Sequence, residues 1–151
     1  MRRTIRQRSR RLGQRGQSAV EFLMALPLVL LLLAGIFEFG KHFYTRLTLR
    51  HAVAEAARFA VTGQSLIDQS TGQPMSRSTS IVQVIVDRAA DLDVDVTGIS
   101  LNPPDGGGPG QIVQIDATYR YRFVLTPIAK FFGNGFVDFT VSTAVINEPA
   151  F

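Results

Sequence analysis

One uninterrupted apolar segment constrains this chain more than any other feature. Residues 22–37 (FLMALPLVLLLLAGIF) contain no charge and no strongly polar group, and Glu21 is the only charge in the five residues before them. A helix needs about 20 residues to cross a bilayer, so this stretch is long enough. Pro27 is expected to remove one backbone hydrogen bond and kink the helix, which membrane helices tolerate. The sequence therefore predicts one transmembrane helix over about residues 18–38, with a buried core helix as the alternative.

The basic residues are concentrated before this apolar segment. Seven of the 16 Lys and Arg residues are arginines within residues 1–16, where no acid occurs. The other nine basic residues and all 12 acids lie beyond Gly16, so the chain of net charge +4 carries −3 after that glycine. By the positive-inside rule, the arginines place the N-terminus in the cytoplasm and the rest of the chain outside. We expect residues 1–16 to be a disordered basic leader, because they offer little apolar surface to bury.

Helical patterning continues beyond the apolar segment. Apolar and small residues recur mostly at steps of three and four, and charged residues fill the other positions. This face consists of Ile36, Gly40, Phe43, Leu47, Ala54, Ala57 and Val61. Gly63 then provides a helix stop. We predict one helix from about Ser18 to Val61, roughly 65 Å long at 1.5 Å per residue, whose outer half is an amphipathic extension.

The remaining residues, 63–151, predict a small extracytoplasmic α+β domain. Its predicted elements are a polar linker over 64–77, an amphipathic helix over 80–92 capped by Ser78 or Ser80, a strand over 94–101, a Gly/Pro-rich loop over 102–110, a half-buried strand over 111–125, a short turn or helix from Pro127 to Phe132, and a last strand over 136–147. The fold class is therefore α+β, with a long N-terminal transmembrane helix that extends into a domain of about three antiparallel strands and one helix.

A short motif lies where the arginines meet the apolar helix. Gly16 is followed by Gln17 and, at the fifth position, by the pair Glu21 and Phe22. This spacing resembles the type III signal cut by prepilin peptidases, in which cleavage follows the glycine and the apolar segment is retained. The resemblance implies that Gln17 becomes the N-terminus. A carboxylate is costly in lipid and is easiest to keep near the positive end of a helix and a cation. An interfacial Glu21 that merely caps the helix is the alternative.

The wider segment resembles the TadE-like family of minor pilins or pseudopilins from tight-adherence (Flp-type) pilus systems. The family's motifs are matched at Arg15, Gly16, Val20, Glu21, Phe22, Leu26, Pro27, Glu38, Phe39, Gly40, Lys41, Ala57, Arg58 and Ala60. The resemblance covers about residues 14–62, and we assign 17–62 as a TadE-like region. It implies a non-enzymatic role in pilus assembly, in which Glu21 meets the N-terminal ammonium of a neighbouring subunit. The implied partners are a prepilin peptidase, the major pilin, other minor pilins and the assembly platform in the membrane.

Many relatives carry a cysteine pair outside the membrane, which this cysteine-free chain lacks. A disulfide-stabilised version of the domain therefore does not apply here.

The sequence contains no pattern that predicts a metal site, a cofactor site or an enzymatic activity. Asp91, Asp93 and Asp95 resemble the start of an EF-hand loop, but Val96 stands where that loop needs glycine. His42 and His51 are nine residues apart and fall on opposite faces of one helix, so they form no ligand pair. We expect Glu38–His42 and His51–Glu55 to be ordinary surface pairs. No phosphate-binding glycine loop and no nucleophile beside a base is recognisable.

Two further interpretations concern the N-terminus. An arginine-rich tail could bind nucleic acid through phosphates, but it adjoins a membrane segment and is removed by the expected cleavage, so we predict no nucleic-acid partner. A conventional or twin-arginine export signal is disfavoured, because no small-x-small cleavage site follows Leu33. The remaining alternative function is a signal-anchored extracytoplasmic binding domain that is not incorporated in a pilus.

Overall fold

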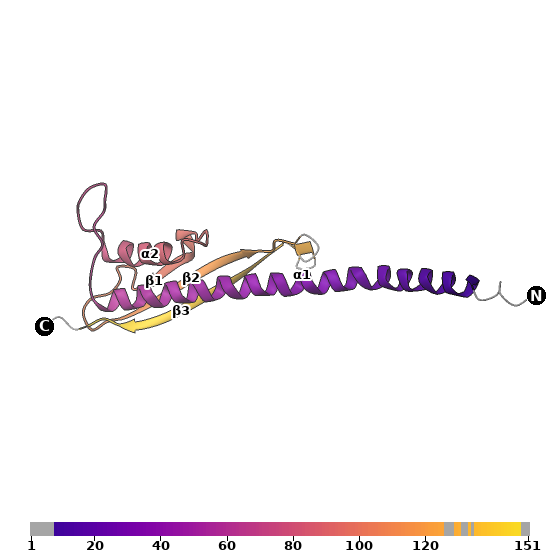
Figure 1. The fold of residues 1–151 in the computed structure, drawn as a ribbon. Helices are drawn as coiled ribbons and strands as arrows, with labels where there is room; N and C mark the ends of the chain where they lie inside the picture. The colour runs from indigo at the N-terminus through magenta and orange to yellow at the C-terminus, as the bar shows by residue number, and fades with distance from the viewer. Residues whose placement is uncertain (1–7, 126–128, 131–132, 134, 149–151) are drawn as a thin grey trace, which may run out of the picture. The chain divides into compact units, whose positions relative to one another are not determined.

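The computed structural model describes residues 8–125, 129–130, 133 and 135–148 (Figure 1). Its elements are helix α1 (Arg8–Val61), helix α2 (Arg77–Arg88), the 3₁₀ helix η1 (Val96–Gly98), and strands β1 (Ile99–Asn102), β2 (Ile112–Arg122) and β3 (Phe136–Ile146). A long apolar N-terminal helix, a second helix and a three-stranded antiparallel sheet confirm the α+β fold class. The chain divides into two compact units, Met1–Phe39 and Gly40–Phe151, and α1 contributes to both.

Helix α1 begins at Arg8, about ten residues earlier than expected. The predicted disorder of the leader is therefore wrong for residues 8–16, while residues 1–7 lie outside the described part of the chain. Arginine and glutamine are good helix formers, and a helix that already exists extends without a new nucleation cost. The apolar segment thus propagates its helix backwards into the basic leader.

The other end of α1 lies at Val61, as predicted. The backbone N–H of Gly63 donates to the carbonyl oxygen of Ala60 at 3.2 Å, and Gly63 adopts a φ of 66°, which favours glycine. The guanidinium of Arg77, at the start of α2, donates to the same carbonyl. A cation at a helix C-terminus is favourable, so α2 also helps to cap α1.

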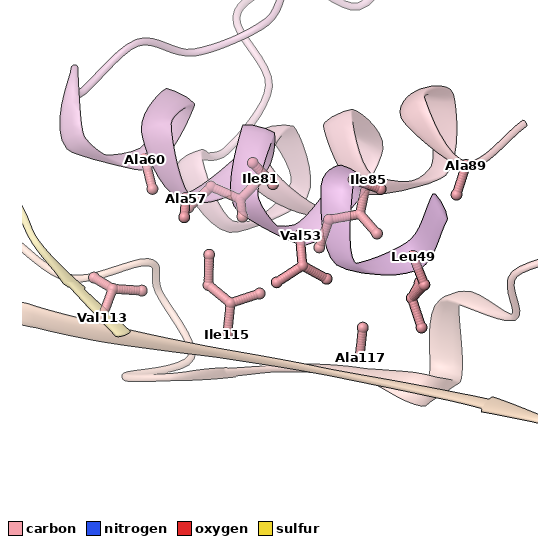
Figure 2. Close-up of a cluster of buried hydrophobic side chains, with 12 residues drawn as sticks. Leu49, Val53, Ala57, Ala60, Ile81, Ile85, Ala89, Val113, Ile115 and Ala117 are labelled. Atoms are coloured by element: carbon pink, nitrogen blue, oxygen red, sulfur yellow. The ribbon is translucent and has the colours of Figure 1, made fainter. Parts of the chain in front are cut away.

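The core of the unit Gly40–Phe151 joins α1, α2 and β2. Figure 2 shows side chains of all three elements pointing toward one another. They are Leu49, Val53, Ala57 and Ala60 from α1, Ile81, Ile85 and Ala89 from the α2 segment, and Val113, Ile115 and Ala117 from β2. Helix and sheet layers of this kind are held mainly by apolar burial.

The apolar face predicted for the outer half of α1 is wrong for most of its members in this unit, although Ala57 is buried as that face implies. Phe43 is 60% exposed, Leu47 is 43% exposed, and Ala54 is also exposed. The buried face instead combines two larger side chains with alanines: Leu49, Ala52, Val53, Ala56, Ala57 and Ala60. Alanine has almost no side chain beyond Cβ, so this face lets α1 approach the sheet closely.

Helix α2 begins three residues earlier than predicted and ends at Arg88 rather than Leu92. Its N-cap is Ser76, whose hydroxyl accepts a hydrogen bond from the N–H of Thr79 at 3.1 Å, so the expected caps Ser78 and Ser80 are wrong. The hydroxyl of Ser80 instead lies in the interior, where it donates to the carbonyl of Ser76 and accepts from the N–H of Leu66. Three serines at alternate positions could each have been the cap by sequence alone.

We expect Ser76→Ala to lower the free energy of unfolding by about 1 kcal/mol, because it leaves the Thr79 N–H without its cap. Urea unfolding of the full chain in detergent micelles, followed by tyrosine fluorescence, measures this change. Ser78→Ala is the matched control and should cost less than about 0.5 kcal/mol, since the Ser78 hydroxyl contacts that of Ser76 at 3.2 Å but the Thr79 N–H is capped by Ser76. Equal losses in both variants would contradict this capping assignment.

The sheet has the order β1-β2-β3, with both pairs antiparallel. The alternation predicted for the central strand is confirmed, because Val113, Ile115 and Ala117 are buried and the residues between them are exposed or half-buried. On the outer face, the Arg120 guanidinium donates two hydrogen bonds to the Asp138 carboxylate at 2.9 and 3.0 Å. This exposed cross-strand pair contributes little stability but is compatible with the register.

The first strand is shorter than predicted. It begins at Ile99, because the chain first forms η1 under an Asp95 cap that accepts from the N–H of Thr97. The Gly/Pro-rich loop 102–110 is confirmed, and the buried side chain of Asn147 donates to the carbonyls of Gly106 and Gly108. The last strand begins at Phe136 as predicted and ends at Ile146. The predicted start of a turn at Pro127 lies outside the described residues.

Candidate processing and assembly site

The residues of the predicted cleavage motif lie within α1 and are exposed. At Gly16, an added Cβ would meet no heavy atom within 4 Å, so the fold itself does not require glycine there. The side-chain amide of Gln17 donates to a carboxylate oxygen of Glu21 at 3.1 Å, one helical turn later. Phe22 follows with its ring exposed. The motif is thus a helical stretch whose side chains are available to another protein.

The apolar part of α1 is not buried among the residues that the structure describes. The helix contains one segment long and apolar enough to cross a membrane, and none of its most apolar window is buried. Every large apolar side chain from Val20 to Phe37 except the half-buried Leu26 is exposed in the folded chain. The alternative of a buried core helix is therefore contradicted, because burial would leave these side chains covered.

The remaining motif positions lie further along α1. The helix continues through Pro27, whose nitrogen has no hydrogen to donate to the preceding turn. Glu38 is only 5% exposed, whereas Phe39 and Gly40 are exposed. A Cβ at Gly40 would again meet nothing within 4 Å. Because Glu38 is buried, the expectation that it lies at the surface in a pair with His42 is wrong as to its exposure.

His42 is the residue whose role sequence reasoning missed. Its ring packs edge-on against Tyr121 at 4.9 Å and against Phe139 at 5.4 Å between ring centroids. Lys41 lies 6.0 Å from the centre of the Tyr121 ring. Within the unit Gly40–Phe151, these contacts attach its first turn of α1 to β2 and β3. The inward phase of Tyr121 was visible in the sequence, but its helical partner was not.

The second expected surface pair, His51 with Glu55, is also replaced. The Glu55 carboxylate lies 3.5 Å from Arg88 on α2 and 3.9 Å from Arg58. In the described ranges, no three His, Asp or Glu side chains come together in a way that could hold a metal ion. Asp91, Asp93 and Asp95 are exposed around the turn between α2 and η1.

These features define a protein with one potential single-pass membrane helix and an α+β unit, in which the motif residues around Gly16 are exposed and Glu38 is buried. Residues 16–58 match the family model described as TadE-like protein, which confirms the resemblance inferred from the sequence. The predicted cleavage residues and the motif residues from Gly16 to Arg58 fall inside the match, whereas Arg15 and Ala60 lie just outside it. No curated protein and no solved structure gives a significant match to the chain.

Proposed function

We propose that this chain is a minor pilin or pseudopilin that contributes to assembly of Flp-type pili and is cut by a prepilin peptidase after Gly16. The observation that supports the proposal most is the spacing of Gly16 and Glu21 at the start of an exposed apolar helix, inside the matched segment. The arginine-rich N-terminus stays in the cytoplasm, and the unit Gly40–Phe151 lies outside the membrane. The protein acts by association, with neither catalysis nor a cofactor.

The mechanism depends on a charge pair formed between neighbouring subunits. Cleavage gives Gln17 a free ammonium group, one helical turn from Glu21. An unpaired carboxylate in the apolar phase is costly, and opposite charges attract strongly where water is absent. Contact between Glu21 of one subunit and the ammonium of the next is therefore favoured at one axial register. The partners are the peptidase, the major pilin, other minor pilins and the assembly platform of the membrane.

We expect Glu21→Ala to enter the membrane normally but to reduce the number of pili per cell at least about tenfold. Removal of the charge makes the segment more apolar, so insertion does not suffer. Removal of one partner from a buried ion pair costs about 3–5 kcal/mol, because the remaining charge is left without compensation. Membrane fractionation measures insertion, and electron microscopy of cells that carry the variant as their only copy measures piliation.

Gln17→Ala is the matched control for this experiment. It removes the Gln17–Glu21 side-chain hydrogen bond but keeps both the carboxylate and the new N-terminal ammonium. Piliation should therefore remain within about twofold of the wild type, since an exposed hydrogen bond contributes little. Normal piliation in Glu21→Ala would exclude the charge pair. Normal piliation in cells without the gene would favour the signal-anchored binding domain.

A further inference from the structure

The unit Gly40–Phe151 leaves one face of α1 uncovered, and this face is both apolar and basic. Phe43 and Leu47 are the exposed apolar members, 60% and 43% exposed. Arg46 and Arg50 are also exposed, and each lies three residues after one of these apolar residues, so all four share one side of the helix. Neither arginine forms an ion pair with another residue in the described part of the chain. We call these four residues the basic stripe.

A second exposed surface of the same unit is acidic. Leu92 and Val94 pack against the core, and the three aspartates that alternate with them are exposed. Val96, the next residue, is 56% exposed. Hydrogen bonds from the backbone N–H and the hydroxyl of Thr97 lower the pKa of Asp95, so its carboxylate is charged at neutral pH. We call residues 91–96 the acidic segment.

The two surfaces lie at the same level along α1. Leu49 and Ala89 both lie toward the end of the core cluster that is opposite to Ala60 and Val113 (Figure 2). Leu49 precedes Arg50 directly, and Ala89 is followed within two residues by Asp91; the N–H of Leu92 donates to the Ala89 carbonyl at 2.8 Å. Two copies whose α1 helices stand side by side in one membrane therefore present stripe and segment at equal depth.

We propose that the basic stripe of one copy binds the acidic segment of a second copy of this chain. The aspartates face Arg46 and Arg50, and Val96 covers part of the apolar surface of Leu47. Charge complementarity selects this arrangement over a symmetric contact between two stripes, which would bring the arginines of both copies together. Because stripe and segment are different surfaces, each copy keeps one of them free, and the contact can repeat from copy to copy.

This contact lies outside the membrane and does not depend on cleavage after Gly16. It can therefore be tested with the full, uncut chain, and its failure would leave the proposed pilus function standing. A side-by-side array of α+β units would add a second, extracytoplasmic determinant of subunit spacing to the proposed contact of Glu21.

Cysteine cross-linking tests the geometry directly, because the natural chain contains no cysteine. Full-length Leu47→Cys and Val96→Cys chains, with different tags, are reconstituted together in phosphatidylcholine liposomes and oxidised. We expect a disulfide dimer that contains both tags. Either variant alone should give only background dimer. The Ile112→Cys chain, whose side chain is 63% exposed on the outer sheet face, is the control for random collision and should also give only background dimer. Efficient dimers from Leu47→Cys alone, or no mixed dimer, would overturn the proposal.

Charge reversal tests the chemistry. Arg50→Glu in the Leu47→Cys chain, or Asp93→Arg in the Val96→Cys chain, should each lower the mixed dimer at least about fivefold, because like charges then face each other. Both reversals together should restore it to within about twofold of the starting value. This pairing would be excluded if the single reversals left the yield of mixed dimer unchanged, or if the double reversal did not restore it. If the dimer formed only with added anionic lipid, this pairing would also be excluded, and the basic stripe would instead bind lipid headgroups.

Discussion

Gly16→Leu is expected to abolish processing of the chain and to leave its fold unchanged. An added Cβ at this position meets no atom within 4 Å, so a leucine side chain has room on the helix surface. The loss would therefore reflect the fit of the cleavage site in the peptidase. Small misplacements at a reacting centre can lower a rate about a hundredfold, and we expect processing to fall by at least that factor.

Mass spectrometry of the chain, produced with and without a prepilin peptidase, measures this prediction. The wild-type chain should begin at Gln17 only when the peptidase is present. Gly35→Leu is the matched control, because Gly35 also lies in α1 with open space around its Cα, and it should be cut normally. An intact Met1 in the wild-type chain, or a cut beyond Ala34, would refute the assigned site.

Ile115→Asp should prevent folding of the unit Gly40–Phe151. Ile115 is fully buried at the centre of the core, where α1, α2 and β2 meet (Figure 2). A carboxylate there would have no partner, and together with the lost apolar burial this costs about 4 kcal/mol or more. Domains of this size have total stabilities of about 5–15 kcal/mol, so most of the folded population would be lost. Rapid proteolysis of the outer unit in membrane vesicles measures the loss.

Ile112→Asp provides the comparison on the same strand. Its side chain lies on the other face of β2 and is 63% exposed, so the same chemical change should cost about 1 kcal/mol or less. Protease resistance close to that of the wild type is expected. Similar degradation of both variants would mean that β2 does not divide an inner from an outer face.

The success of the sequence analysis at β2 has a clear physical cause. One face of this strand meets the core and the other meets solvent, so burial alternates with a period of two and the sequence must alternate with it. The glycines and prolines after Asn102 and the glycine at 63 likewise need special backbone geometry and identify their own turns. These signals are local, and a single sequence contains them in full.

The inward face of α1 could not be predicted in the same way. The large apolar residues Phe43 and Leu47 dominated the helical pattern, yet the fold buries the alanines around Leu49 and Val53. Which side of a helix faces the sheet depends on how closely the partner approaches, and this is a property of the tertiary packing. The same limit explains His42, since its contacts with Tyr121 and Phe139 join residues about 80 to 100 positions apart. The predicted cleavage motif was recognisable from the sequence alone, whereas the exposure of its side chains is known only from the structure.

The unbroken course of α1 through Gly16 gives the proposed cleavage an electrostatic role. In the uncut chain, Glu21 lies well inside a helix that began at Arg8, far from either end of the helix dipole. A cut after Gly16 would free the N–H groups of a new first turn and add an ammonium charge just before Glu21. Cleavage would then determine when a subunit can assemble, because the positive helix N-terminus that attracts a neighbour's carboxylate exists only after the leader has been removed. Uncut copies would enter the membrane, but they would lack the N-terminal ammonium charge that binds a neighbouring subunit during assembly.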